Sequence, residues 1–197
     1  MKQLFPEAAF YGDCYDRYDL FGRKPGAEFT GETIMAHCVY STDAEIRLLK
    51  QNGVYVAHCP ASNMNLSSGI APIRMYLELG LRVGLGSDVA GGQTESMFRA
   101  MTDAIQVSKL YWRLVDESSK PLIFDEVFYL ATMGGGAFFG KVGSFADGYE
   151  FDALVLDDVG LPHPQELNLH QRLERFAYLS ADSEGILSKY VAGKQIL

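Results

Sequence analysis

Three apolar segments of the chain each lead into a side chain that can bind a metal ion or move a proton. Segment 33–37 ends at His37, segment 54–58 ends at His58, and segment 81–86 is followed closely by Asp88. Imidazole and carboxylate groups together suit a zinc-class ion, and they also suit proton transfer near neutral pH. An Asp before glycines is also a common turn former or helix cap. Because three segments end alike, we expect His37 and Asp88 to do chemistry. For His58 a structural role stays equally open.

The residues between these segments predict helices, so the order is βαβαβ. Residues 41–45 carry helix-capping residue types, and the helix that follows ends at Asn52-Gly53. A second helix is expected over 72–79, before Gly80. This order is typical of a parallel sheet, in which neighbouring strands lie about 4.8 Å apart and end at one rim. His37, His58 and Asp88 can therefore converge on one small ligand.

The rest of the chain is less regular. Residues 1–31 predict a loop with one short helix, and the Pro, Ser, Asn and Gly content of 59–69 predicts a loop without regular structure. Two more helices are expected near 93–115 and 124–133. A strand over 151–157 and a hairpin over 188–197, turning at Gly193, predict a small β-rich unit. We expect one part over residues 1–143 and another over 144–197.

Composition excludes several classes of protein. The chain has 197 residues, 48% of them hydrophobic and 21% charged, which is the composition of a globular domain with one good core. The formal net charge of −8 argues against a nucleic acid or an anionic membrane as partner. Three cysteines cannot form a full disulfide set, which favours a reduced, cytoplasmic compartment. The first residues lack the apolar run of a secretory leader, and we expect no membrane span.

The metal-ligand inventory is short. A catalytic zinc takes about three protein ligands, whereas the chain has four histidines and no His-x-His pair. His163 and His170 lie in the polar tail, where we expect them to be solvated. The rim residues alone therefore make an incomplete metal site.

Longer motifs around these residues resemble the amidohydrolase superfamily of metal-dependent hydrolases. Segments 35–38, 57–69 and 84–92 are similar to the last three barrel strands and their loops in that superfamily. Segments 147–153 and 190–195 are similar to its composite β-domain. The resemblance runs over nearly all of residues 30–197. It implies an α/β fold made of the last three βα units of a (β/α)8 barrel (a partial TIM barrel) plus the carboxyl-terminal part of a small composite β-domain.

The resemblance also implies a reaction and residue roles. The reaction is hydrolytic removal of an amino group from a purine base, with guanine as substrate and xanthine and ammonia as products. Asp88 corresponds to a zinc ligand that also accepts the proton of the attacking water. His37 corresponds to a residue beside the attacked carbon, and His58 and Asn63, with the loop 59–69 and Gly91-Gly92, would line the base pocket. The complete enzyme is expected to be a homodimer.

The remaining family ligands and a proton-shuttling Glu have no counterpart in this order. The chain is therefore expected to begin beyond them and to be inactive alone. Alternatives are an aminohydrolase or chlorohydrolase of another ring, a non-catalytic fragment that needs a complementary chain, and a metal-free binding module.

Overall fold

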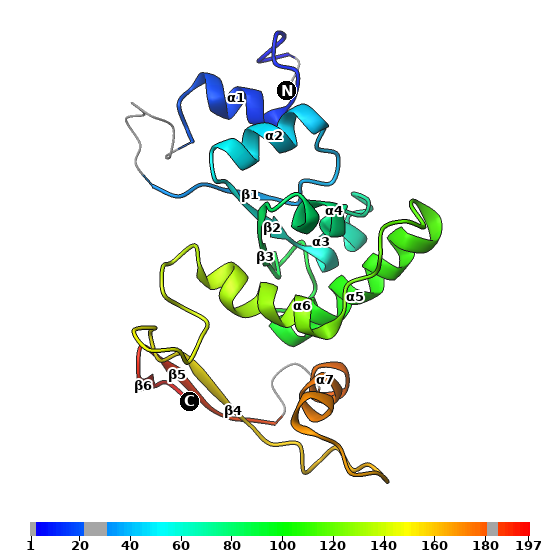
Figure 1. The fold of residues 1–197 in the computed structure, drawn as a ribbon, viewed down its shortest axis with the longest axis vertical. Helices are drawn as coiled ribbons and strands as arrows, with labels where there is room; N and C mark the ends of the chain where they lie inside the picture. Colours follow the sequence, from blue (N-terminus) through cyan, green and yellow to red (C-terminus); the bar gives the residue numbers. More distant parts are fainter. Residues whose placement is uncertain (1–2, 22–30, 181–184) are drawn as a thin grey trace.

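The computed structural model describes residues 3–21, 31–180 and 185–197. Its centre is a parallel sheet of β1 (Ile34–Ala36), β2 (Tyr55–His58) and β3 (Arg82–Leu85), in the order β1-β2-β3 (Figure 1). The register pairs Ala36 with Ala57 and Ala57 with Gly84, so the strands end almost level. The three predicted strands and their parallel pairing are confirmed.

Two of the connecting helices begin and end where the sequence predicts. In α2 (Asp43–Gln51) the Thr42 hydroxyl accepts a hydrogen bond from the Glu45 N–H at 3.3 Å. Gly53, with φ of 61°, then turns the chain towards β2, in a conformation that glycine adopts without strain. Helix α4 (Ile73–Glu78) leads into β3. The inner faces of both helices bury large side chains against the sheet, and the predicted short first helix is α1 (Tyr11–Arg17), which lies against α2.

The prediction of an irregular loop over 59–69 is wrong for its first half. Residues Pro60–Asn65 form the helix α3 directly after β2. Pro60 occupies the first helical position, where its fixed φ fits and its missing N–H costs nothing. Ser62 and Asn63, whose polar side chains contributed to the prediction of an irregular loop, are buried in this helix.

Beyond the sheet, α5 (Met97–Leu114) and α6 (Phe124–Tyr129) match the two further helices, and α6 continues as the π-helix η1 (Leu130–Gly134). The glycines that follow allow very close packing. A Cβ on Gly84 would lie 2.8 Å from Gly135 Cα, and a Cβ on Gly134 would lie 2.7 Å from the Val83 carbonyl oxygen. These glycines therefore fit the end of η1 directly onto β3.

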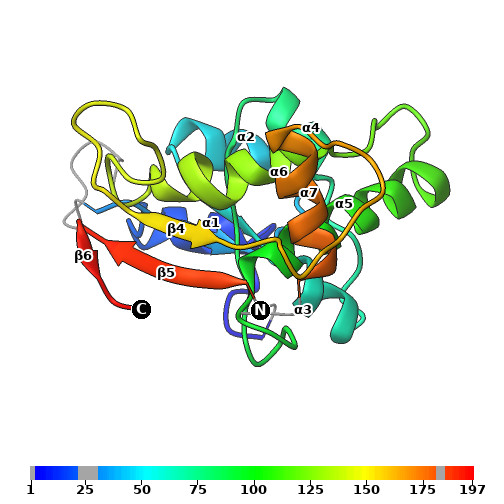
Figure 2. The ribbon, with the colours of Figure 1, turned by 90° about the horizontal axis from the view of Figure 1, so that it is seen from below.

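The carboxyl-terminal part contains the predicted strands and one helix that was not predicted. Strands β4 (Ala153–Leu156), β5 (Ile186–Val191) and β6 (Lys194–Gln195) form an antiparallel sheet, with Gly193 in the turn of the predicted hairpin. Helix α7 (Leu169–Leu179) lies beside α5 (Figure 2). Its Phe176 is buried and packs edge-on against Phe98, with ring centroids 5.1 Å apart.

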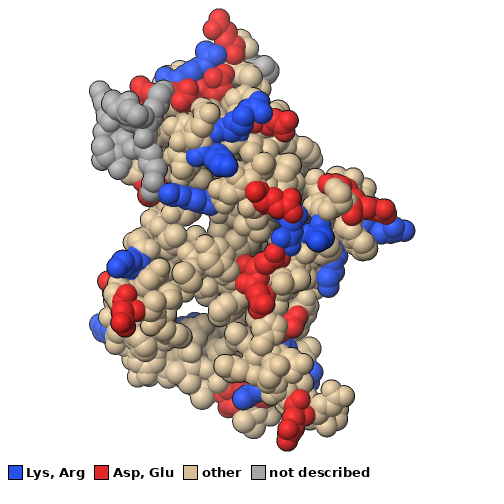
Figure 3. Space-filling view, in the orientation of Figure 1, with Lys and Arg blue, Asp and Glu red and all other residues tan. Residues whose placement is uncertain are grey.

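The described residues thus form a mixed α/β fold with two small sheets rather than a closed barrel. No helix among them is long and apolar enough to cross a membrane. On the face shown in Figure 3, acidic and basic side chains are interspersed rather than gathered into one basic patch.

Candidate functional site

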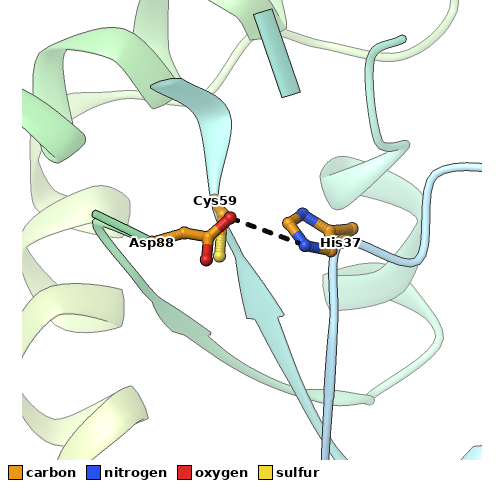
Figure 4. Close-up of side chains that lie close together, drawn as sticks. All are labelled: His37, Cys59 and Asp88. Atoms are coloured by element: carbon orange, nitrogen blue, oxygen red, sulfur yellow. Dashed lines mark ion pairs between the residues drawn. The ribbon is translucent and has the colours of Figure 1, made fainter. Parts of the chain in front are cut away.

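Three predicted site residues come together at the carboxyl edge of the parallel sheet. His37 directly follows β1, Asn63 lies on α3 after β2, and Asp88 follows β3. The His37 Nε2 atom lies 3.7 Å from Asp88 Oδ2, a gap too long for a hydrogen bond (Figure 4). On the other side of the ring, His37 Nδ1 and Asn63 Oδ1 are 2.8 Å apart. Because the amide oxygen can only accept, Nδ1 donates this hydrogen bond, and Nε2 faces Asp88.

His37 and Asp88 both have a backbone conformation that is uncommon for residues other than glycine. His37 has φ of 68° and Asp88 has φ of 49°, in the left-handed region that costs a non-glycine residue on the order of 1–3 kcal/mol. The His37 N–H donates to the Ala57 carbonyl oxygen at 2.9 Å, which ties this turn to β2. Such strain persists only where the surrounding structure imposes it, and it clusters at functional sites.

The loop after β3 folds back over Asp88. The Gly92 N–H donates to the Asp88 carbonyl oxygen at 2.6 Å, and the Asn65 amide donates to the Gly91 carbonyl oxygen at 2.9 Å. A Cβ on Gly91 would lie 2.7 Å from Ser62 Oγ and 3.0 Å from Asp88 Oδ2. Glycine at position 91 therefore lets the loop approach the carboxylate and α3 together.

A fourth side chain, Cys59, joins the group. One ligand atom each from His37, Cys59 and Asp88 can be chosen so that all three lie within 4.8 Å of one another. The Cys59 side chain is buried, and burial together with the nearby Asp88 carboxylate raises the pKa of its thiol to about 11. Cys59 was not among the predicted site residues, although its position at the end of β2 is the same signal that pointed to His37 and Asp88.

His58 does not lie in this group. Successive side chains of a strand point to opposite sides, so His58 and Cys59 face opposite ways at the end of β2. The His58 ring is fully buried, and neither ring nitrogen has a partner among the described residues. Burial, and secondly the charge of His37, lowers the pKa of His58 to about 3, so the ring is neutral at physiological pH. It lines a small cavity with Ala104 and Ser108, which favours the structural alternative.

The donors that are present fit a zinc-class metal only in part. Asp88 offers an exposed carboxylate and His37 a directed nitrogen, but Cys59 is the only further donor that joins them within the part of the chain the structure describes. The two histidines of the carboxyl-terminal part, His163 and His170, are not members of this group. His170 Nε2 pairs with Asp125 Oδ1 at 2.6 Å. His163, which stands three residues before Glu166 in the sequence, is exposed in the loop before α7, and its ring contacts the Gln165 carbonyl oxygen.

In enzymes built on parallel barrel strands the active site lies at the carboxyl ends of those strands, which is where His37 and Asp88 stand. Residues 7–195 match the amidohydrolase family, and the chain belongs to this family.

The relatives that it resembles include guanine deaminases. The chain is 47% identical to a guanine deaminase from C. acetobutylicum whose crystal structure holds bound guanine, with a TM-score of 0.90 over 100% of this chain and 45% of that one. It is 35% identical over 209 residues to the mouse (Mus musculus) guanine deaminase, covering 100% of this chain and 44% of the relative. An adenosine deaminase from Xanthomonas campestris with bound zinc is 26% identical, with a TM-score of 0.69 over 83% of this chain and 36% of that one. The chain spans less than half the length of each of these relatives.

Proposed function

We propose that this chain carries the carboxyl-terminal part of the active site of a guanine deaminase, which hydrolyses guanine to xanthine and ammonia. The observation that carries the proposal is the convergence of His37, Asn63 and Asp88 at one sheet edge. The likeness to a guanine-bound structure over the whole chain supports it. In this proposal β1, β2 and β3 are the last three strands of a (β/α)8 barrel within residues 1–143. Residues 144–197 belong to a composite β-domain, and the complete enzyme is a homodimer.

The residues at the carboxyl edge of the parallel sheet have different roles in the proposed reaction. When zinc is bound to a site of this kind, it lowers the pKa of a bound water. Asp88 would supply one ligand to such an ion, and its carboxylate would accept a proton from the attacking water. His37, held by Asn63, directs Nε2 at the attacked carbon and its new hydroxyl group. The remaining metal ligands and the group that returns the proton to the leaving ammonia lie outside this chain.

A chimera tests the proposal. This chain replaces the matching carboxyl-terminal part of the C. acetobutylicum guanine deaminase in one polypeptide, and circular dichroism checks that the product is folded. We expect zinc-dependent release of xanthine and ammonia from guanine, and none from adenosine. The Asp88→Asn chimera serves as the inactive control.

The specific alternative is an aminohydrolase of another ring, as the likeness to an adenosine deaminase suggests. A folded chimera that prefers adenosine over guanine would support that alternative and overturn the assignment of substrate. Ammonia release from guanine by the isolated 197-residue chain would show that this chain alone holds a complete active site, contrary to the proposal.

A further inference from the structure

We propose that the small cavity beside His58 is a binding site for one water molecule, which bridges a ring nitrogen of His58 and the Ser108 hydroxyl. The cavity lies between the end of β2, the helices α4 and α5, and the segment before α6. Its walls do not include His37, Asn63 or Asp88, so the site is separate from the proposed active site and independent of the proposed deaminase activity.

The first argument is the hydrogen-bonding demand of the His58 ring. The residue is 1% exposed, and neither ring nitrogen has a hydrogen-bond partner within the part of the chain that the structure describes. Buried polar atoms of folded proteins nearly always have a partner, which is either another protein group or an ordered water. A neutral imidazole has one nitrogen that donates and one that accepts. Because water can do both, it is a suitable partner for either tautomer of His58.

The second argument is that Ser108, on α5, can accept one more hydrogen bond. Its hydroxyl donates to the Ile105 carbonyl oxygen at 2.7 Å and accepts from the Leu122 N–H at 2.9 Å. A hydroxyl has one proton and two lone pairs, so one lone pair of Ser108 Oγ remains. A water that donates to Ser108 and binds His58 satisfies both groups. It also connects the end of β2, through α5, to the buried Leu122.

The third argument is size. The cavity has a volume of about 10 Å³, measured as the space open to the centre of a water molecule. One bound water needs about 10–15 Å³ on this measure, so the space suits a single water rather than a larger ligand. Buried waters usually have about three polar partners. Tyr111, whose hydroxyl can donate and accept, lines the same cavity as a further polar side chain.

The competing possibility is a dry cavity. Part of its wall is apolar, since the buried residues Ala71, Ala104 and Val107 contribute to it, and cavities lined only by apolar groups stay dry. A dry cavity leaves both nitrogens of His58 unsatisfied, which costs the full free energy of removing a polar group from water. Because His58 and Ser108 border the same cavity, one water molecule removes this cost for the nitrogen that it binds.

Two measurements on the 197-residue chain test the site. In a crystal structure that resolves ordered water, we expect one water within about 3.2 Å of a His58 ring nitrogen and of Ser108 Oγ. In solution, the magnetic relaxation dispersion of oxygen-17 in water counts the water molecules that stay bound long enough to tumble with the protein. The His58→Leu variant replaces the ring with a side chain of similar size and no polar atom. It should hold one such water fewer than the wild type.

His163→Leu is the matched control, because His163 is exposed in the loop before α7 and does not line the cavity. This variant should hold as many long-lived waters as the wild type. Circular dichroism shows which variants are folded, and if His58→Leu does not fold, the crystal structure of the wild type decides. A wild-type cavity without ordered water, or equal numbers of long-lived waters in the wild type and a folded His58→Leu, would overturn the proposal.

Discussion

At the scale of the residue, Asp88 has two proposed tasks, whereas His58 has none that requires contact with the substrate or a metal. The Asp88 carboxylate faces His37 across the open edge of the sheet, and the His58 ring is fully buried. In the active chimera, Asp88→Asn should lower turnover of guanine by about 10²-fold or more, because an amide accepts no proton. Asn also tolerates the left-handed backbone of position 88, so the fold should survive.

Turnover and zinc content of the two chimeras check this prediction. The His58→Asn chimera should keep its zinc, and its turnover should stay within about tenfold of that of the unsubstituted chimera. The reason is that His58 transfers no proton in the proposed reaction. If Asp88→Asn kept both zinc and turnover while His58→Asn lost them, the roles of the two residues would have to be exchanged.

Burial of His58 also makes the stability of the chain depend on pH. Its folded-state pKa, lowered to about 3, lies below the unfolded value of 6.5, so the unfolded chain binds the extra proton first. The free energy of unfolding should therefore fall as pH drops from about 6.5 towards 3, by up to about 1.4 kcal/mol per pH unit from this one group.

Urea unfolding of the isolated chain at pH 7 and pH 5 measures the effect. His58→Gln should be less stable at pH 7 but should lose less stability than the wild type on going to pH 5. His163→Gln, which changes an exposed histidine, should behave as the wild type does. An equal pH dependence in wild type and His58→Gln would contradict a buried neutral ring.

At the scale of the element, the contact of η1 with β3 depends on glycines. A methyl group on Gly84 would lie 2.8 Å from the Gly135 Cα, and backbone cannot move aside as a flexible side chain can. Gly84→Ala should destabilise the chain by about 1–3 kcal/mol, the usual cost of overpacking. Gly160→Ala is the control, because a Cβ there meets nothing within 4 Å, and its unfolding midpoint in urea should stay close to that of the wild type. Equal midpoints for both variants would show that η1 can shift away from the sheet.

The elements also show what sequence patterns could and could not predict. Apolar runs that end in His37, His58 and Asp88 predicted the three strands and their shared edge. A helix between two successive strands is the usual connection of a parallel pair, and parallel strands end at the same edge. The Pro, Ser, Asn and Gly content of 59–69 does not predict helix α3, although Pro60 favours the first helical position.

Two further features depend on contacts distant in sequence. Helix α7 is held by packing such as that of Phe176 on Phe98, which its polar composition conceals. Cys59 lies at the site because successive side chains at the end of β2 point to opposite sides of the sheet, so that Cys59 faces away from His58. His37 reaches the same place because its backbone adopts the left-handed conformation. Neither contact can be inferred from local propensity alone.

At the scale of the whole molecule, the chain spans less than half of the relatives it resembles, and the donors at its sheet edge make only part of a catalytic site. The isolated chain should therefore produce no xanthine from guanine above a no-protein control, with or without added zinc. The sample must be free of host deaminase, which a matched preparation of Asp88→Asn reveals. Zinc-dependent xanthine formation by the wild type but not by Asp88→Asn would contradict this prediction.

Within the described part of the chain, the β1 edge of the parallel sheet is open. Among the described residues β1 pairs only with β2, and Ile34 on this strand is 44% exposed. Unpaired backbone groups beside exposed apolar side chains recruit further strands, and a lysine on an edge strand opposes this. The isolated chain should therefore self-associate as its concentration rises, and Ile34→Lys should shift light scattering towards the mass of a single chain. Val159→Lys adds the same charge at an exposed apolar residue outside the sheets and should leave the association unchanged. If both substitutions reduced scattering equally, net charge rather than the β1 edge would control association.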